Sequence, residues 1–264
     1  MKICFLTITF TITSGLLLAG LISPDLASGE TAPAPPAPVA PGKVVIPAGP
    51  FKMEAQVMVE GWKVNIHPAL WEKERDATAA ALRLLQAQLA EIVRVVPAPA
   101  VAKLREVPLW FSPQYPGTNG GAEYHPDAGW LRGNGRDPAM AKGIEFSNIS
   151  RFAQEMERMP NFALHELAHA FHDRVLTFTK PEILTAFASA KAAGTYDRVA
   201  RHHGNGRPET VEKAYAMADA KEYFAEGTEA LFSRNDYFPF TRAELDAHDP
   251  VLAELLGRLW GGTF

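Results

Sequence analysis

Hydrophobic residues recur at helical intervals in several stretches of the chain. Between Glu72 and Val96 they stand at positions 80, 84, 85, 89, 92 and 96, and Pro97 follows. Because an α-helix turns once in about 3.6 residues, this spacing gathers them on one face of a helix. Similar patterns and flanking caps predict further helices over residues 148–159, 161–176, 181–193 and 218–233, and a last one from Pro250 to Gly261 after the N-cap candidates Thr241 and Asp249.

Short apolar runs between these helices predict a few strands. They lie within residues 51–66, where two strands flank a glycine, and at 107–111 and 143–147. Residues 112–136 and 201–208 are rich in glycine, proline or asparagine, and we interpret them as loops. Many helices with few strands predict an α+β fold, mostly helical with a small sheet.

The N-terminal region differs in composition from the rest of the chain. An apolar, threonine-rich run follows Lys2 and is succeeded by small residues at 27–29, as in a secretory signal peptide with its cleavage site. Proline and alanine dominate the residues after it, which is typical of an extended linker. We therefore predict a signal peptide over 1–29, a linker over 30–42 and one folded domain over 43–264.

Export follows from this interpretation, so we expect the protein to be secreted, periplasmic or attached to the cell surface. The alternative is an uncleaved membrane anchor, because an apolar run of about 20 residues is long enough to cross a bilayer. The only cysteine is Cys4. Cleavage would leave a mature chain without a disulfide and without a cysteine ligand for a metal.

The composition is that of a soluble globular protein. The chain has 264 residues, 47% of them hydrophobic and 21% charged, which is enough for one sizeable core. The formal net charge is −4, and no run of five basic residues occurs. This argues against nucleic acid as a partner, and against a membrane partner unless the N-terminal segment stays attached.

Residues 165–169 read His-Glu-Leu-Ala-His, an H-E-x-x-H motif inside a predicted helix. Four residues turn a helix by about 400°, so His165 and His169 leave one face about 40° apart and can share one metal ion. Glu166 lies beside them and can reach a water on that metal. Two nitrogen ligands, an open position and a carboxylate base are the layout of a zinc peptidase. The simpler alternative is an amphipathic helix with two solvated histidines.

A catalytic zinc ion needs a third protein ligand. The metzincin pattern requires glycine at 172 and histidine at 175, where this chain has His172 and Val175. A later predicted helix offers Glu222 and Glu226, four residues apart on one face. The first can bind metal, and the second can accept a hydrogen bond from a ligand histidine. Glu229 competes with them, and a solvated acidic face is the simpler alternative.

The H-E-x-x-H motif and the segment E-Y-F-A-E about fifty residues later resemble the gluzincin group of metallopeptidases. More closely, the pattern looks like the catalytic domain of anthrax lethal factor and the related Pro-Pro endopeptidases, over residues of roughly 145–235. The resemblance implies a zincin-like metallopeptidase domain in which Glu222 is the third zinc ligand and Glu226 the partner of a ligand histidine. It also implies that Tyr215, seven residues before Glu222, stabilises the oxyanion.

These observations predict a secreted zinc-dependent metallopeptidase, most simply an endopeptidase, that acts on a peptide or protein substrate. The predicted ligands of its one Zn²⁺ are His165, His169 and Glu222. Glu166 is the predicted general base, and Tyr215 the donor to the oxyanion. We expect the strand at 143–147 to pair with the substrate backbone. Two rivals remain: a metal-dependent hydrolase of a non-peptide amide, and an idle domain that binds peptides or surface polymers, which has no need for Glu166.

Overall fold

The structure is a computed structural model that describes residues 55–147 and 149–261. The predicted signal peptide, the linker and residues 43–54 lie outside the described residues. By backbone contacts the chain divides into residues 1–38 and 39–264, and every described residue belongs to the second unit. Within the described ranges, no helix combines the length and the apolar character that crossing a lipid bilayer requires.

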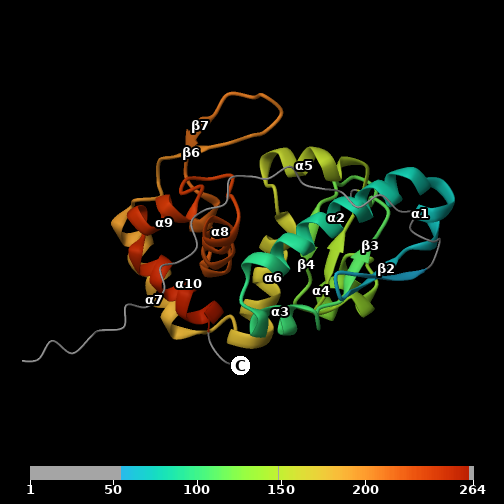
Figure 1. Cartoon of the computed structure of the whole chain (residues 1–264), viewed down its shortest axis with the longest axis horizontal. Coiled ribbons are helices and arrows are strands. Elements are labelled where there is room, and N and C mark those ends of the chain that lie inside the picture. The colour runs from blue at the N-terminus through green and yellow to red at the C-terminus, as the bar shows by residue number, and fades with distance from the viewer. Residues whose placement is uncertain (1–54, 148, 262–264) are drawn as a thin grey trace, which may run out of the picture. The chain divides into compact units, whose positions relative to one another are not determined.

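Five short strands form one mixed sheet (Figure 1). In spatial order they are β1 (Gln56–Val59), β2 (Trp62–Ile66), β3 (Leu109–Phe111), β5 (Ile144–Phe146) and β4 (Ala122–Tyr124). Strands β2, β3 and β5 run parallel, whereas β1 and β4 pair antiparallel at the two ends. The expectation that residues 143–147 offer a free edge is wrong, because β3 and β4 occupy both sides of β5. Among the described residues the outer strands of this sheet are β1 and β4, and β4 is the one that lies against α6.

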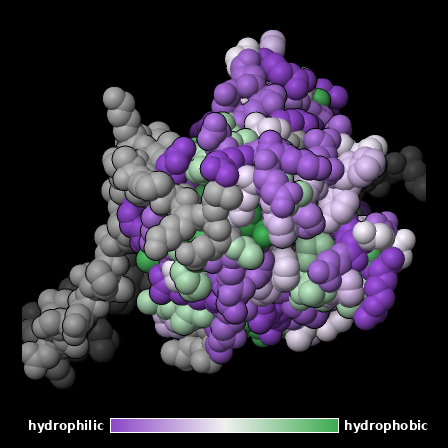
Figure 2. Space-filling model, turned by 90° about the vertical axis from the view of Figure 1, so that its right-hand side faces the viewer, coloured by the Kyte–Doolittle hydropathy of each residue, from purple (hydrophilic) through white to green (hydrophobic). Residues whose placement is uncertain are grey.

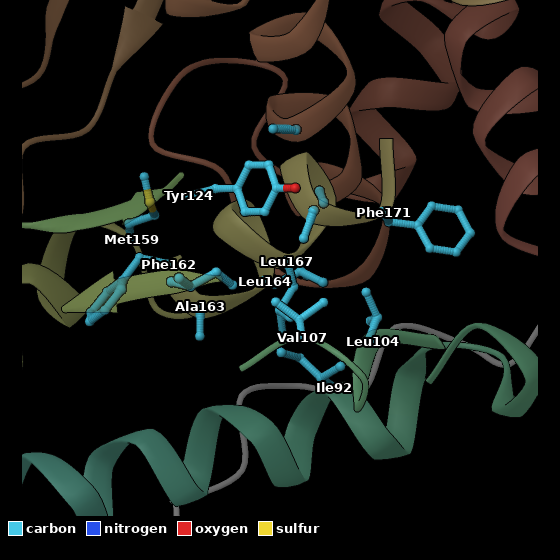
Figure 3. Packing of buried hydrophobic residues seen from close by; sticks show 14 of the residues in the cluster. Ile92, Leu104, Val107, Tyr124, Met159, Phe162, Ala163, Leu164, Leu167 and Phe171 are labelled. Carbon is cyan, nitrogen blue, oxygen red and sulfur yellow. The ribbon is translucent and has the colours of Figure 1, made fainter. Parts of the chain in front are cut away.

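The helical elements that accompany the sheet strands and lead to the motif helix are α1 (Pro68–Lys73), α2 (Arg75–Val95), α3 (Ala98–Leu104), α4 (Ala128–Gly133), η1 (Pro138–Met140), η2 (Ile149–Arg151) and α5 (Phe152–Arg158). The motif helix itself is α6 (Phe162–Phe171). Leu85, Leu89 and Ile92 of α2 are buried, as the spacing predicts, whereas Ala80 and Leu84 are only half-buried. Figure 3 shows Leu164 and Leu167 of α6 above Ile92 of α2, with Leu104 and Val107 beside them. This contact holds the motif helix against the core.

The rest of the chain is mainly helical. Its elements are the π-helix η3 (His172–Leu176), α7 (Pro181–Ala193), the hairpin of β6 (Val199–Arg201) and β7 (Thr210–Glu212), η4 (Tyr215–Met217), α8 (Ala220–Phe232), α9 (Arg242–His248) and α10 (Pro250–Gly261). Trp260 of α10 stacks on Phe171 of α6 at 4.1 Å between ring centroids. Its Nε1 also donates to Thr228 Oγ1 on α8, 3.1 Å away. One indole therefore ties α10 to both helices of the site.

The mixed helix-and-sheet class is confirmed, as are the long helices and the strands at β1–β3 and β5. Helix α7 ends at Gly194, a left-handed residue with φ of 69° that carries no Cβ penalty. The loop interpretation of residues 112–136 is wrong in part, because they contain β4 and α4. Residues 202–208 lie in the turn of the β6–β7 hairpin, as expected, and only Arg201 belongs to a strand. Helix α3 was not expected.

The surface seen in Figure 2 is mostly hydrophilic outside the grey atoms, with hydrophobic residues in small separate groups. The large apolar side chains are instead buried in one core that includes residues of the sheet, α2, α6, α8 and α10. The core therefore holds α6 and α8 in place.

Candidate functional site

Helix α6 carries the H-E-x-x-H residues, and Asn161 fixes its start. The Asn161 side chain accepts a hydrogen bond from Leu164 N at 3.1 Å, which caps the helix, and donates another to the Gln88 carbonyl of α2 at 3.1 Å. One helical turn later, His165 and His169 are both buried. Their Nε2 atoms lie 3.1 Å apart. The helix thus presents two imidazole nitrogens to one point, as the spacing predicts.

Helix α8 brings a carboxylate to the same point. Asp219 caps this helix by accepting hydrogen bonds from Lys221 N at 2.7 Å and Glu222 N at 3.1 Å. Glu222 stands in the first turn, with its Oε2 atom 3.3 Å from His165 Nε2 and 3.2 Å from His169 Nε2. Two helices that are far apart in the sequence therefore contribute three donor atoms to one cluster.

These three atoms fit a single metal ion. They form a nearly equilateral triangle with sides of 3.1–3.3 Å. Ligands of a tetrahedral ion, bound at about 2.0–2.1 Å each, would lie roughly 3.3 Å from one another. In addition, Glu222 Oε2 is buried and has no hydrogen-bond donor within the described residues. Such a carboxylate oxygen is costly unless a cation compensates it, so the cluster can hold one metal ion.

The charged groups of the cluster shift each other's pKa. Burial opposes the charged form of His165, but the Glu229 and Glu222 carboxylates outweigh it and raise the pKa of His165 well above its usual range. Burial likewise opposes ionisation of Glu222, yet His165 and His169 hold the pKa of the Glu222 carboxyl well below its usual range. The ionised Glu222 carboxylate suits a bound cation, whereas His165 has to release its extra proton before its Nε2 atom can bind one.

The partner of the ligand histidine is Glu229, and the assignment of this role to Glu226 is wrong. Glu229 Oε2 lies 3.2 Å from His165 Nδ1. Glu226 instead accepts a hydrogen bond from Asn235 Nδ2 at 3.0 Å. Seven residues turn a helix by nearly two full turns, so Glu229 lies only about 20° from Glu222 around the axis. Glu226 lies about 40° away on the other side and meets a different neighbour.

The Glu166 carboxylate contacts the free edge of the sheet. Its Oε2 atom accepts a hydrogen bond from the backbone N–H of Tyr124 in β4, at 2.8 Å. On either side of β4, the backbone groups of Gly121 and His125 bond to residues that flank β5. Because these groups alternate along an antiparallel strand, Ala122 and Tyr124 turn theirs to the free edge. The motif glutamate and an open strand edge are therefore neighbours.

Tyr215 lies in η4, directly before α8, and half of its surface is exposed. It lines the same cavity as His165, Glu166 and Glu222. Its partial burial and the nearby Glu222 carboxylate raise the pKa of the Tyr215 hydroxyl. The hydroxyl consequently keeps its proton near neutral pH and can act as a hydrogen-bond donor to a ligand in the cavity.

A cavity of about 570 Å³ covers these groups, a size common for ligand sites. Besides the motif residues, its walls include the β4 residues Ala122 and Tyr124, the aromatic residues Phe152 and Phe162, and the charged residues Arg158 and Asp236. Arg158 Nη1 donates to the buried Asp236 carboxylate at 2.5 Å. The cavity therefore offers backbone, apolar and charged contacts next to the cluster.

A second group of candidate ligands consists of Glu123, His125 and Glu145. His125 Nε2 lies 2.9 Å from Glu145 Oε2, and Arg136 Nη1 donates to the same oxygen at 3.0 Å and also to Glu123. A guanidinium already supplies the positive charge that these carboxylates need. We therefore interpret this group as a partly buried ion-pair network that supports β4 and β5.

The structure brings together His165, Glu166, His169, Glu222 and Tyr215 around one cavity. Sequence reasoning missed the contact of Tyr124 with Glu166, and no local signal in a Gly-rich segment points to it. Compared with known proteins, the chain matches no protein-family model, no curated protein and no solved structure. The case for a function therefore rests on the chemistry of the site.

Proposed function

We propose that this protein is a zinc-dependent metallopeptidase with a zincin-type domain. The observation that carries the proposal is the triangle of His165 Nε2, His169 Nε2 and Glu222 Oε2, with sides of 3.1–3.3 Å, beside the Glu166 carboxylate. Two imidazoles and one carboxylate are a set that catalytic zinc uses, and three protein ligands leave a fourth position for water. The orphaned Glu222 oxygen supports a cation at this place.

A peptide is the substrate that the surroundings favour. The free edge of β4 exposes the backbone N–H and C=O of Ala122 beside the cluster. An extended peptide can pair with such an edge and gain affinity through main-chain hydrogen bonds. This pairing would carry a substrate carbonyl past Glu166, whose carboxylate contacts the next outward-facing residue, Tyr124.

Each residue has a role that follows from its position. Zinc bound by His165, His169 and Glu222 would polarise the scissile carbonyl and acidify a water molecule. Glu166 takes the proton of that water and passes it to the leaving amine, using the oxygen that Tyr124 does not hold. Tyr215 donates a hydrogen bond to the oxyanion. Glu229 holds His165 through Nδ1, so that Nε2 is free to bind metal.

The first test is zinc content and peptide cleavage on the purified full chain. Elemental analysis should find one zinc per chain, and none in His165→Ala or Glu222→Ala. A peptide library read by mass spectrometry should show hydrolysis by the wild type. Glu166→Gln should keep the zinc and lose the hydrolysis, which separates binding of the metal from its use.

The rivals give different results in the same test. Zinc binding without cleavage of any peptide, but with hydrolysis of small amides, would support an amidase that uses the same cluster. Peptides retained without cleavage, equally by wild type and Glu166→Gln, would support a binding domain. Equal zinc occupancy in wild type and Glu222→Ala would refute the ligand assignment.

A further inference from the structure

Tyr124 connects the edge strand to the motif helix at two points. Its backbone N–H donates to Glu166 Oε2 at 2.8 Å, and its hydroxyl donates to Asp173 Oδ2 at 2.7 Å. Glu166 lies in α6, and Asp173 lies in the π-helical turn η3 that directly follows it. One tyrosine contacts both carboxylates. In Figure 3 its hydroxyl points along the helix toward the Phe171 end.

The backbone contact is not part of the sheet. The residues that bond β4 to β5 are Gly121, Glu123 and His125, so the N–H of Tyr124 faces the free edge, as does that of Ala122. Without Glu166 this N–H would bond to water or substrate. Glu166 thus accepts a hydrogen bond from a backbone N–H that has no partner within the sheet.

The hydroxyl contact has a well-held acceptor. The Asp173 carboxylate also pairs with Lys142 Nζ at 2.5 Å, and its side chain is only 14% exposed. Arg174, the next residue, donates to the Lys142 carbonyl at 3.1 Å. Burial raises the pKa of the Tyr124 hydroxyl, so it stays protonated and donates. Tyr124 is therefore held both at its backbone N–H and at its hydroxyl.

We propose that Tyr124 is a positioning residue for Glu166. Its N–H fixes one carboxylate oxygen, and its hydrogen bond to Asp173 fixes the piece of strand that carries the N–H. The inference rests on the proposed function, in which Glu166 is the base. A base must be held to within about 0.5 Å of its working position, and a displacement of about 1 Å can cost roughly 10²-fold in rate. The same strand would bind the substrate, so substrate pairing and base orientation are coupled through Tyr124.

The first arm of the test needs no activity. Amide hydrogen exchange of the full chain, followed by NMR, compares two outward-facing amides of one strand, Tyr124 and Ala122. We expect the Tyr124 amide to exchange about tenfold more slowly, as one extra hydrogen bond provides. This protection should vanish in Glu166→Ala and weaken in Tyr124→Phe. Equal exchange of the two amides in the wild type, or no effect of Glu166→Ala, would overturn the proposal.

The second arm is kinetic and compares zinc-loaded variants at equal metal content. Tyr124→Phe removes only the hydroxyl. Tyr115→Phe is the matched control, because the Tyr115 hydroxyl donates to the Glu145 carboxylate of β5 at 2.6 Å and not to Asp173. We expect kcat to fall about 10- to 100-fold in Tyr124→Phe with KM within twofold, and to stay near the wild-type value in Tyr115→Phe.

Asp173 provides the second variant. Asp173→Ala should lower kcat as Tyr124→Phe does. Asp173→Asn should retain much of the activity, because its amide oxygen can accept the same hydrogen bond. The double variant Tyr124→Phe/Asp173→Ala should lose no more kcat than either single variant. Equal losses in Tyr124→Phe and Tyr115→Phe would mean a loosened sheet and would overturn the proposal, as would an unchanged kcat in Tyr124→Phe. If the wild type cleaves no peptide, the proposed function fails, and the exchange arm still decides whether Tyr124 holds Glu166.

Discussion

Glu229→Gln is the substitution that most directly tests the geometry around His165. The Glu229 carboxylate lies 3.2 Å from His165 Nδ1, and both residues are buried. A carboxylate at this nitrogen keeps the proton on Nδ1, which leaves the Nε2 lone pair for the metal. Glutamine has nearly the same shape but no charge, so the substitution removes the electrostatic part of the contact and little else.

The expected loss is 10- to 100-fold in zinc affinity, the usual effect of removing the partner of a metal-binding histidine. This corresponds to about 1.4–2.8 kcal/mol of binding free energy. Glu226→Gln is the matched control on the same helix. Burial and the neighbouring Glu229 and Asp236 carboxylates raise the pKa of Glu226 well above its usual range. Glu226 also accepts its hydrogen bond from Asn235 rather than from a ligand histidine, so its replacement should change zinc affinity by less than about threefold.

The assay is competition for zinc against a chelating indicator at pH 7, with all three proteins measured at the same ionic strength. The ranking is the decisive result: Glu229→Gln should bind zinc more weakly than Glu226→Gln, which should resemble the wild type. If Glu226→Gln is the weaker binder, the resemblance-based assignment of the histidine partner is right and the contact in the structure is not the functional one. If neither variant differs from the wild type, the partner of His165 does not tune the metal.

Three further predictions concern stability and rate. Gly227→Ala should lower the free energy of unfolding, measured in urea, by about 1–3 kcal/mol, because the new Cβ would lie 2.7 Å from Leu252 Cδ2. Gly257 has open space around it, so Gly257→Ala should raise the free energy of unfolding by about 1 kcal/mol. Burial lowers the pKa of His172 to about 4 in the folded chain. As the pH falls from 6.5 to 4, the unfolded chain binds a proton that the folded chain does not, so the free energy of unfolding should fall by about 3 kcal/mol. His172→Leu should lose this pH dependence. Tyr215→Phe should reduce kcat by about 10²–10³ with zinc content unchanged; an unchanged kcat would exclude the oxyanion role.

The long helices were predictable because their evidence is local. The apolar spacing of α2, the Asn161 cap before α6 and the Asp249-Pro250 start of α10 each lie within a few residues of the element they define. Strand β4 has no such evidence. Three residues, AEY, are too few to show alternation, and Gly120 and Gly121 precede them. The strand forms because it pairs with β5, and the sequence of residues 122–124 alone does not predict that pairing.

The site divides in the same way. His165, Glu166 and His169 were predictable from helical spacing alone, because one helix fixes their relative directions. Glu222 required a contact between α6 and α8, and sequence spacing left three glutamates open for two roles. Helical angles favour Glu229 slightly, since it lies closer than Glu226 to the direction of Glu222. Only the packing of α8 along α6 decides which carboxylate reaches His165 Nδ1.

Helix α6 shows why the motif is informative and yet incomplete. One side, with Leu164 and Leu167, faces the core and α2. A second side presents His165 and His169 to α8, and a third presents Glu166 to β4. The spacing within the helix determines these three directions, so the chemistry of the motif can be predicted from five residues. What each direction meets depends on elements far away in the sequence. A substitution that moves β4 or α8 should therefore alter the reaction while the motif itself stays intact.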